Sequence, residues 1–264
     1  MKNRAITLLV ALTVVSGAAH ADAESTYLFS TTSAYLGGGV AYMPRYAGSK
    51  DYRAAPLLDA SVHFKNGFYA DSAQGMGYQF KFSDRFYATA ALGADPGRKE
   101  KDDVLRPGSD YLKGMGDIKQ AALAHIGLGF QFNDRSDISL MASKAMGQAS
   151  YGASLHLLGH VVAWKDTNNT IDLNGAVHYG NGNYNQTYFG VSDMQSTRTR
   201  FAPFAPGSGI YAVDATATWT HQFSGHWFTR VSGGATRYMR DVGRSPIVQE
   251  KMGYILASSL DYRF

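Results

Sequence analysis

The chain has 264 residues, no cysteine, 29 glycines, 17% charged residues and a formal net charge of +4. Without cysteine, a disulfide framework, a thiol catalyst and a thiolate zinc site are excluded. The hydrophobic content of 45% excludes a disordered chain, and the thin spread of positive charge excludes a basic stripe for nucleic acid.

The first 21 residues are typical of a secretory signal peptide. Lys2 and Arg4 precede an apolar run, and small residues stand before the cleavage point. The run is shorter than the ~20 residues that a membrane-spanning helix needs. We therefore expect export, cleavage after Ala21 or alternatively after Ala23, and one mature domain over 22–264.

From residue 34 onward, apolar and polar residues alternate with the period of two that is typical of β-strands. Tyr254 and Leu256 share one parity in the last segment, while Gly253 and Asp261 share the other. Twelve strands are expected, in chain order, at 34–44, 53–64, 66–73, 75–83, 85–95, 117–131, 135–148, 151–166, 168–179, 208–222, 226–240 and 252–264.

Strand length and aromatic placement favour a membrane barrel over a soluble sandwich. Many segments approach the ~9–11 residues of a tilted transmembrane strand, and aromatics lie near their ends. The longest connections, 45–52, 96–116, 180–207 and 241–251, fall on one side. We therefore expect an all-β fold, a transmembrane antiparallel up-and-down β-barrel of about 12 strands with long extracellular loops and short periplasmic turns. Ten strands remain the alternative if 66–73 and a neighbour are lost.

The sequence offers little catalytic chemistry. Outer-membrane lipases activate a serine with a His-x-Ser pair, which is absent here, and we find no Ser/His/carboxylate set at strand-face spacing. His156 and His160 would lie about 13 Å apart on a strand, too far to share a metal ion, so we expect them to be polar fillers of the lumen. No enzyme activity, cofactor or metal is expected.

Six charged or histidine side chains lie on the polar parity of their segments and are candidates to line the lumen: Lys81, Asp172, His178, Asp214, Arg230 and Arg240. The aromatic residues of the long connection 180–207 are poorly suited to a bare solvated loop. We therefore expect 183–206 to pack over or into the lumen as a plug.

Several blocks resemble the MipA/OmpV family of outer-membrane proteins, in order from about residue 34 to the C-terminus. The residues that carry the resemblance are Pro44, Tyr46, Gly48 and Ser49, then Asn185, Gln186, Thr187, Tyr188, Phe189 and Gly190, then His226 and Trp227, and finally Ser245 and Pro246. The resemblance implies a non-enzymatic barrel in the Gram-negative outer membrane. One branch is described as a scaffold that joins a murein lytic transglycosylase to a murein polymerase.

Other members of that family are linked to antibiotic permeability and host adhesion, so a channel for small solutes or antibiotics and a surface adhesin are the alternatives. Tyr262 and Phe264 resemble the C-terminal signal that the barrel assembly machinery recognises. Outer-membrane lipid, that machinery and the two murein enzymes are therefore the expected partners, without nucleic acid. Five tight turns and residues 22–33 give a scaffold little periplasmic surface, because a specific interface buries ~800 Å² per partner.

Overall fold

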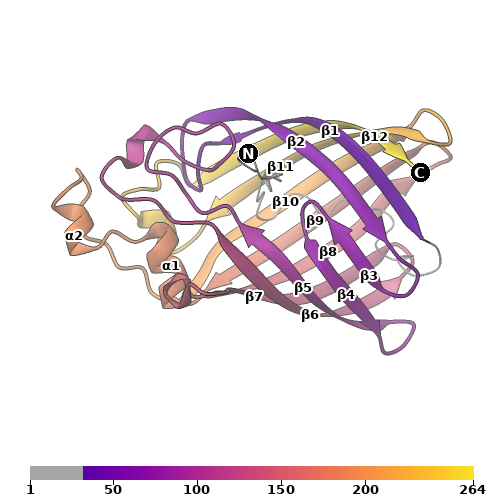
Figure 1. Ribbon diagram of the computed structural model, residues 1–264, viewed down its shortest axis with the longest axis horizontal. Coiled ribbons are helices and arrows are strands. Elements are labelled where there is room, and N and C mark those ends of the chain that lie inside the picture. Colours follow the sequence, from indigo (N-terminus) through magenta and orange to yellow (C-terminus); the bar gives the residue numbers. More distant parts are fainter. Residues whose placement is uncertain (1–31) are drawn as a thin grey trace, which may run out of the picture.

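The computed structural model describes residues 32–264, which form one closed antiparallel barrel (Figure 1). Each strand pairs with its neighbours in sequence, and the last strand pairs with the first. The strands are β1 (Ser33–Pro44), β2 (Tyr52–His63), β3 (Phe68–Asp71), β4 (Gly75–Lys81), β5 (Phe86–Asp95), β6 (Ala121–Asn133), β7 (Ser136–Ala145), β8 (Ala153–Lys165), β9 (Asn169–Gly180), β10 (Gly209–Gln222), β11 (Trp227–Tyr238) and β12 (Met252–Arg263).

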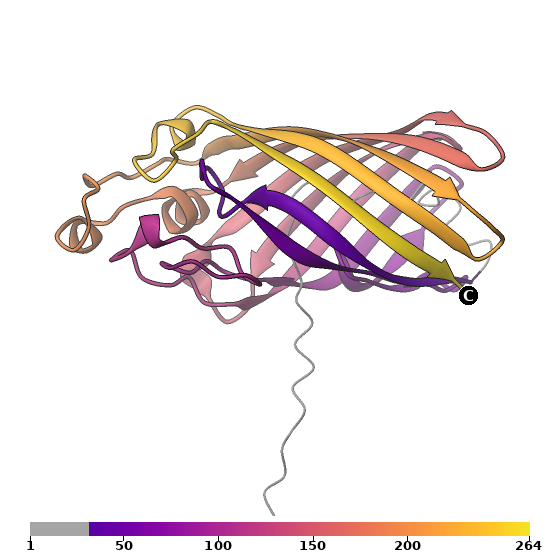
Figure 2. The ribbon, with the colours of Figure 1, turned by 90° about the horizontal axis from the view of Figure 1, so that it is seen from above.

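The helices are short and lie in the connections at one end of the barrel, on the left of Figures 1 and 2. Within residues 32–264, no helix is long and apolar enough to cross a bilayer. The helical elements are η1 (Asp110–Leu112), η2 (Ala149–Tyr151), α1 (Gly182–Phe189), α2 (Asp193–Ser196) and η3 (Val242–Arg244).

The expected twelve-stranded barrel is confirmed, and the ten-stranded alternative is wrong. The third strand, expected at 66–73, is present but has only four residues, because a turn begins at Ser72. The sixth begins four residues later than expected, at Ala121, because 117–120 belong to the preceding loop. The expected signal peptide, residues 1–21, lies outside the described residues.

The two faces of the wall differ because side chains alternate along each strand. The outward face is apolar at mid-height, with exposed side chains such as Leu128 and Leu256. Tyrosines border this band at the loop end: Tyr42, Tyr179 and Tyr254. Phenylalanines and tryptophans border it at the turn end: Phe64, Phe68, Phe80, Phe82, Phe86, Phe132, Trp164, Trp219, Phe223, Trp227 and Phe264. Such a band between two aromatic belts is the outer surface of a transmembrane barrel.

At the turn end, five short connections join β2 to β3, β4 to β5, β6 to β7, β8 to β9, and β10 to β11. The C-terminus lies at this end (Figure 2), where the backbone N–H of Phe264 donates to the carbonyl of Ala34 at 3.0 Å. In outer-membrane barrels the short turns are periplasmic and the long loops extracellular. The loop end is therefore called the outer end below.

Candidate functional site

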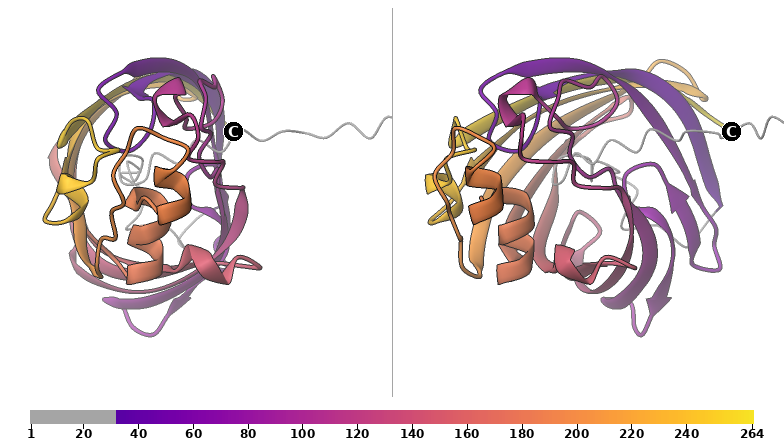
Figure 3. Two further views of the ribbon diagram at one scale, coloured as in Figure 1. Left: turned by 90° about the vertical axis from the view of Figure 1, so that its left-hand side faces the viewer. Right: turned by 60° about the vertical axis from the view of Figure 1, so that its left-hand side comes forward.

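A cap covers the outer mouth of the barrel (Figure 3, left). We define it as the loops 45–51, 96–120, 181–208 and 239–251, which leave the rim at separate positions. One buried apolar cluster takes side chains from all four loops: Tyr46, Leu112, Met115, Val191, Phe201 and Ile247. Loops rooted around the rim can share one cluster only by meeting across the mouth. The segment 183–206, expected to pack over or into the lumen, lies in this cap.

Polar contacts fasten the loops to one another. The hydroxyl of Tyr46 donates to the carbonyl of Ile247 at 2.8 Å, and Ser245 Oγ donates to the carbonyl of Phe189 at 2.5 Å. The guanidinium of Arg98 donates to the carbonyl of Tyr188 at 2.6 Å. Burial lowers the pKa of Arg98 to about 10, which leaves it cationic at neutral pH. Each of these bonds joins two different loops of the cap.

The helix α1 is built for its place over the lumen. Asn181 caps its first turn by accepting from the N–H of Tyr184 at 2.9 Å. Asn185, which is 1% exposed, donates to the carbonyl of Gly207 at 2.7 Å and so ties the two ends of the loop together. Gly152 approaches so closely that a Cβ there would lie 2.3 Å from the N of Tyr184. Only glycine fits this position, which also has a φ of +76°.

Three of the four family-like blocks meet in the cap. Tyr46 and Ser49 of the first block are buried there, as are Asn185 and Phe189 of the second and Ser245 of the fourth. In the first block, Pro44 ends β1, and Gly48 has a φ of +89° and lies beside Val248. In the second block, the carbonyl of Gln186 accepts from the N–H of Gly190, and Thr187 Oγ1 donates to the carbonyl of Ser150. In the fourth block, Pro246 follows Ser245.

The third block lies at the opposite end of the molecule. His226 stacks on Tyr262 with ring centroids 5.4 Å apart, and Trp227 meets the same ring at 5.1 Å. Tyr262 also contacts Phe264 at 5.3 Å. The proposed assembly signal therefore shares the periplasmic aromatic belt with this block.

An aromatic stack leads from the cap into the lumen. The rings of Tyr188 and Tyr184 are 4.7 Å apart, and Tyr184 is 5.2 Å from Tyr211 at the start of β10. Tyr211 stacks on His178 at 5.6 Å. Burial raises the pKa of Tyr184 to about 12, and burial together with the carboxylate of Asp95 raises that of Tyr188. Both hydroxyls are therefore neutral hydrogen-bonding groups in the cap.

Below this stack, four side chains form a hydrogen-bonded chain across β8, β9 and β10. Ser154 Oγ lies 2.8 Å from His156 Nε2, and His156 Nδ1 lies 2.7 Å from His178 Nδ1. His178 Nε2 contacts the carboxylate of Asp214. The expectation that no Ser/His/carboxylate set exists at strand-face spacing is therefore wrong. The expectation rested on the order His-x-Ser, whereas the pair here runs in the order Ser154-Leu155-His156.

One assignment of protons satisfies this whole chain. If Ser154 donates to His156, then His156 donates to His178, and His178 donates to the Asp214 carboxylate, so every step has one donor and one acceptor. Ser154 is 7% exposed and His178 is 4% exposed. The chain therefore braces three neighbouring strands from inside, directly beneath the cap.

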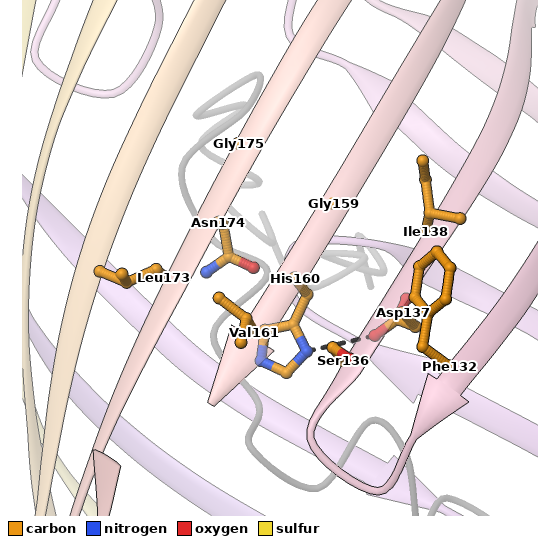
Figure 4. Close-up of a pocket in the computed structure, with 10 residues that line it drawn as sticks. All are labelled: Phe132, Ser136, Asp137, Ile138, Gly159, His160, Val161, Leu173, Asn174 and Gly175. Atoms are coloured by element: carbon orange, nitrogen blue, oxygen red, sulfur yellow. Dashed lines mark hydrogen bonds and ion pairs between the residues drawn. The ribbon is translucent and has the colours of Figure 1, made fainter. Parts of the chain in front are cut away.

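A second polar cluster lies lower in the wall (Figure 4). His160 Nδ1 lies 3.2 Å from Asp137 on β7, which is the contact drawn in Figure 4. The Nε2 of His160 lies 3.1 Å from Asp172 on β9. The hydroxyl of Tyr87 donates to Asp137 at 3.2 Å. His156 and His160 thus point to the same face but use different partners. The adjacent glycines Gly159 and Gly175 belong to a shallow pocket in this part of the wall.

A third cluster spans the seam where β12 meets β1. Arg230 on β11 contacts the carboxylate of Asp59 on β2, and its Nε lies 3.5 Å from the carboxylate of Asp261 on β12. Its guanidinium also donates to the hydroxyl of Tyr35 at 3.2 Å. Ser259 Oγ lies 2.7 Å from Asp261. The cluster therefore links four strands around the closing seam.

The lumen candidates are thus divided. Asp172, His178, Asp214 and Arg230 lie in the three inward clusters. Lys81 ends β4 at the periplasmic rim and is exposed, outside these clusters. Arg240 was expected to line the lumen, and this expectation is wrong. β11 ends at Tyr238, and Arg240 lies exposed in the cap with a φ of +46°.

The sequence interpretation missed partners of these residues. Asp59, Asp137 and Asp261 hold Arg230 and His160, yet none of the three was a lumen candidate. All three lie on the polar parity of their strands, so that parity applied to every strand would have found them.

Comparison with protein families gives one match, to the family described as MltA-interacting protein MipA, over residues 36–264. The chain belongs to the MipA family. It is an outer-membrane β-barrel protein of that family. No curated protein gives a significant match.

Solved structures with low sequence identity include two porins and a channel. A KdgM porin in complex with disordered oligogalacturonate is 11% identical, covering 89% of this chain and 99% of that one with a TM-score of 0.46. An outer membrane channel from Pseudomonas putida F1 is also 11% identical, with coverages of 89% and 96% and a TM-score of 0.45. The NanC porin is 8% identical, with coverages of 87% and 98% and a TM-score of 0.44.

Proposed function

We propose that this chain is a non-enzymatic scaffold of the outer membrane whose outer mouth is held shut by the cap and whose periplasmic rim docks murein enzymes. The cap is the observation that carries the proposal, because four loops rooted around the rim share one buried cluster and so meet across the outer mouth. The family description, MltA-interacting protein, supports a lytic transglycosylase as one partner. The murein polymerase is the second.

The chain reaches its place through a signal peptide that is cleaved after Ala21 or Ala23, and the barrel assembly machinery inserts it by way of Tyr262 and Phe264. The docking surface consists of the five periplasmic turns. Their exposed charges include Lys65 between β2 and β3 and Arg135 between β6 and β7. Turns at several positions around the periplasmic rim together supply the interface area that no single turn offers.

Charge reversal at the rim tests this proposal. The refolded barrel is placed in lipid nanodiscs, and the dissociation constant for a purified MltA-type transglycosylase is measured. We expect Lys65→Glu with Arg135→Glu to weaken binding by roughly tenfold or more, since rim charges steer and position a partner. The matched control reverses two exposed lysines of the cap, Lys50→Glu with Lys113→Glu, and should bind as the parent does. No binding by the parent, or equal loss in both variants, would contradict the scaffold.

A solute channel is the second candidate, because the lumen wall carries the His178 and His160 clusters with their carboxylates. In that case ions or small polar solutes would pass through the intact barrel, and Asp172→Asn would change the ion selectivity. A barrel that passes no ions leaves the scaffold as the better account.

A further inference from the structure

The barrel wall is interrupted between β2 and β5. The two strands between them, β3 and β4, have four and seven residues, against twelve in β2 and ten in β5. β2 pairs with β3 only through Ser61, Val62 and His63. From Tyr52 to Asp59, β2 is paired with β1 on one side and has no strand on the other. Figure 1 shows the short β3–β4 hairpin ending part-way along the barrel, short of the outer, left-hand end of β2.

The open edge of β2 carries unpaired backbone groups. Ala60 turns its N–H and its C=O toward the hairpin, where both bond to Ser72. Because backbone direction alternates along a strand, Ala54, Pro56 and Leu58 turn toward the gap in the same way. Their backbone groups have no hydrogen-bond partner among residues 32–264. Pro56, which has no N–H to offer, stands where a ladder bond is not made.

The gap begins at the level of the hydrocarbon core of the bilayer. Tyr52, at the top of β2, stacks on Tyr42 of the outer tyrosine belt at 5.2 Å, and Phe64 follows β2 in the periplasmic belt. The N–H of Ser72 donates to the carbonyl of Ala60 at 2.8 Å. Ala60 stands four residues before Phe64, so this bond lies about 13 Å along the strand from the periplasmic belt. The turn 72–74 therefore lies within the ~25 Å apolar band.

Polar groups at this depth need a partner. The carboxylate of Asp71 accepts from the N–H of Ala73 at 2.7 Å and from that of Gln74 at 2.9 Å. Irregular backbone and an open strand edge do not face lipid tails directly; they occur where protein covers them or where they line water. The gap must therefore hold water or a polar part of a ligand.

The gap joins two different environments. Three inter-strand spacings of ~4.8 Å separate β2 from β5, so the backbones lie ~14 Å apart. On the outside the gap is bordered by exposed apolar side chains: Leu58, Met76 and Leu92. On the inside lie Arg53 and Asp59, and Arg53 donates to the carbonyl of Val104, where the loop 96–120 closes the gap from above.

We propose that this gap is a lateral window that binds a single-chain amphiphile from the outer leaflet. The apolar chain lies among Leu58, Met76 and Leu92, and the polar head bonds to the open edge at Ala54 and Leu58. A strand from another protein is a poor occupant, because Pro56 interrupts the donors that a new strand would need. The window goes beyond the scaffold function and does not depend on it.

The first test measures whether the window holds water. The chain has no cysteine, so Ala73→Cys gives a single thiol in the turn 72–74. A charged, membrane-impermeant methanethiosulfonate should label it at least about 100-fold faster than it labels Leu128→Cys, because a thiol among lipid tails does not ionise. Leu128 is the matched control, exposed on the outward face of β6, which is paired on both sides. Equal rates would overturn the window.

The second test measures whether an amphiphile enters. Leu57→Cys, on the inward parity of β2 beside the gap, is labelled with bimane in the full mature barrel in vesicles. A dibrominated fatty acid should remove most of its fluorescence. The control label at Leu158→Cys, on the inward parity of β8 across the lumen, should keep its fluorescence. No quenching at Leu57→Cys, or the same quenching at both sites, would overturn the proposal, and neither result bears on binding at the periplasmic rim.

Discussion

The two ends of the barrel are held by different means. At the outer end, buried side chains from loops far apart in sequence, such as Tyr46 and Ile247, hold one another. At the periplasmic end each turn is closed by its own residues, as where Asp166 accepts from the N–H groups of Asn168 and Asn169. The cap should therefore loosen as a unit when one contact is removed, whereas each turn is held by its own residues and by the strand beside it.

The largest loss of stability should come from a substitution in the third cluster, at the seam between β12 and β1, which stabilises the barrel wall and not the cap. Arg230→Met leaves the buried carboxylate of Asp261 and the half-buried carboxylate of Asp59 without their guanidinium. We expect the free energy of unfolding to fall by roughly 3–5 kcal/mol, measured by urea titration in lipid vesicles. Arg237→Met, on the exposed face of the same strand, is the control and should change it by less than about 0.5 kcal/mol. Equal changes in the two variants would contradict the role of the cluster.

A large local effect should follow from removing an apolar contact inside the cap. Leu112 is 0% exposed in the shared cluster, so Leu112→Ala should destabilise the cap by roughly 2–5 kcal/mol. Because cleavage follows the open population, proteolysis of the loops should quicken about 30-fold or more, with barrel unfolding unchanged. Leu105→Ala, in the same loop but partly exposed, should cleave at nearly the parent rate. If both variants cleave alike, the cluster does not hold the loops together.

The smallest effect should come from one hydroxyl. Tyr46→Phe keeps the ring and loses the bond to the carbonyl of Ile247, which should cost about 0.5–1.5 kcal/mol and quicken proteolysis of the cap by no more than roughly tenfold. Tyr111→Phe is the control, because its ring packs on the same cluster through Phe201 at 5.2 Å. An unchanged rate in Tyr46→Phe would show that this bond does not fasten the first loop.

The alternation of residues was enough to predict the barrel and its twelve strands, because the wall faces lipid on one side and the lumen on the other. The four-residue length of β3 was not predictable in this way, since residues 66–73 do not alternate: Phe68, Tyr69 and Ala70 are consecutive apolar residues, and Asp71 and Ser72 are both polar. For the clusters of Arg230 and His160, the sequence predicts which side chains face the lumen but not which of them pair. Parity identifies which side chains point inward, but the register between strands decides that Asp59 meets Arg230 and Asp137 meets His160.

Single-channel recording in planar bilayers shows directly whether the cap closes the outer mouth. The refolded mature protein is compared with a variant in which 185–206 is replaced by a short Gly-Ser linker, after both are shown to be heat-modifiable barrels. If the cap closes the mouth, the intact protein should give no discrete conductance steps and the variant should give regular, ion-selective steps. Steps of equal size from both would contradict it, and would make the barrel an open channel.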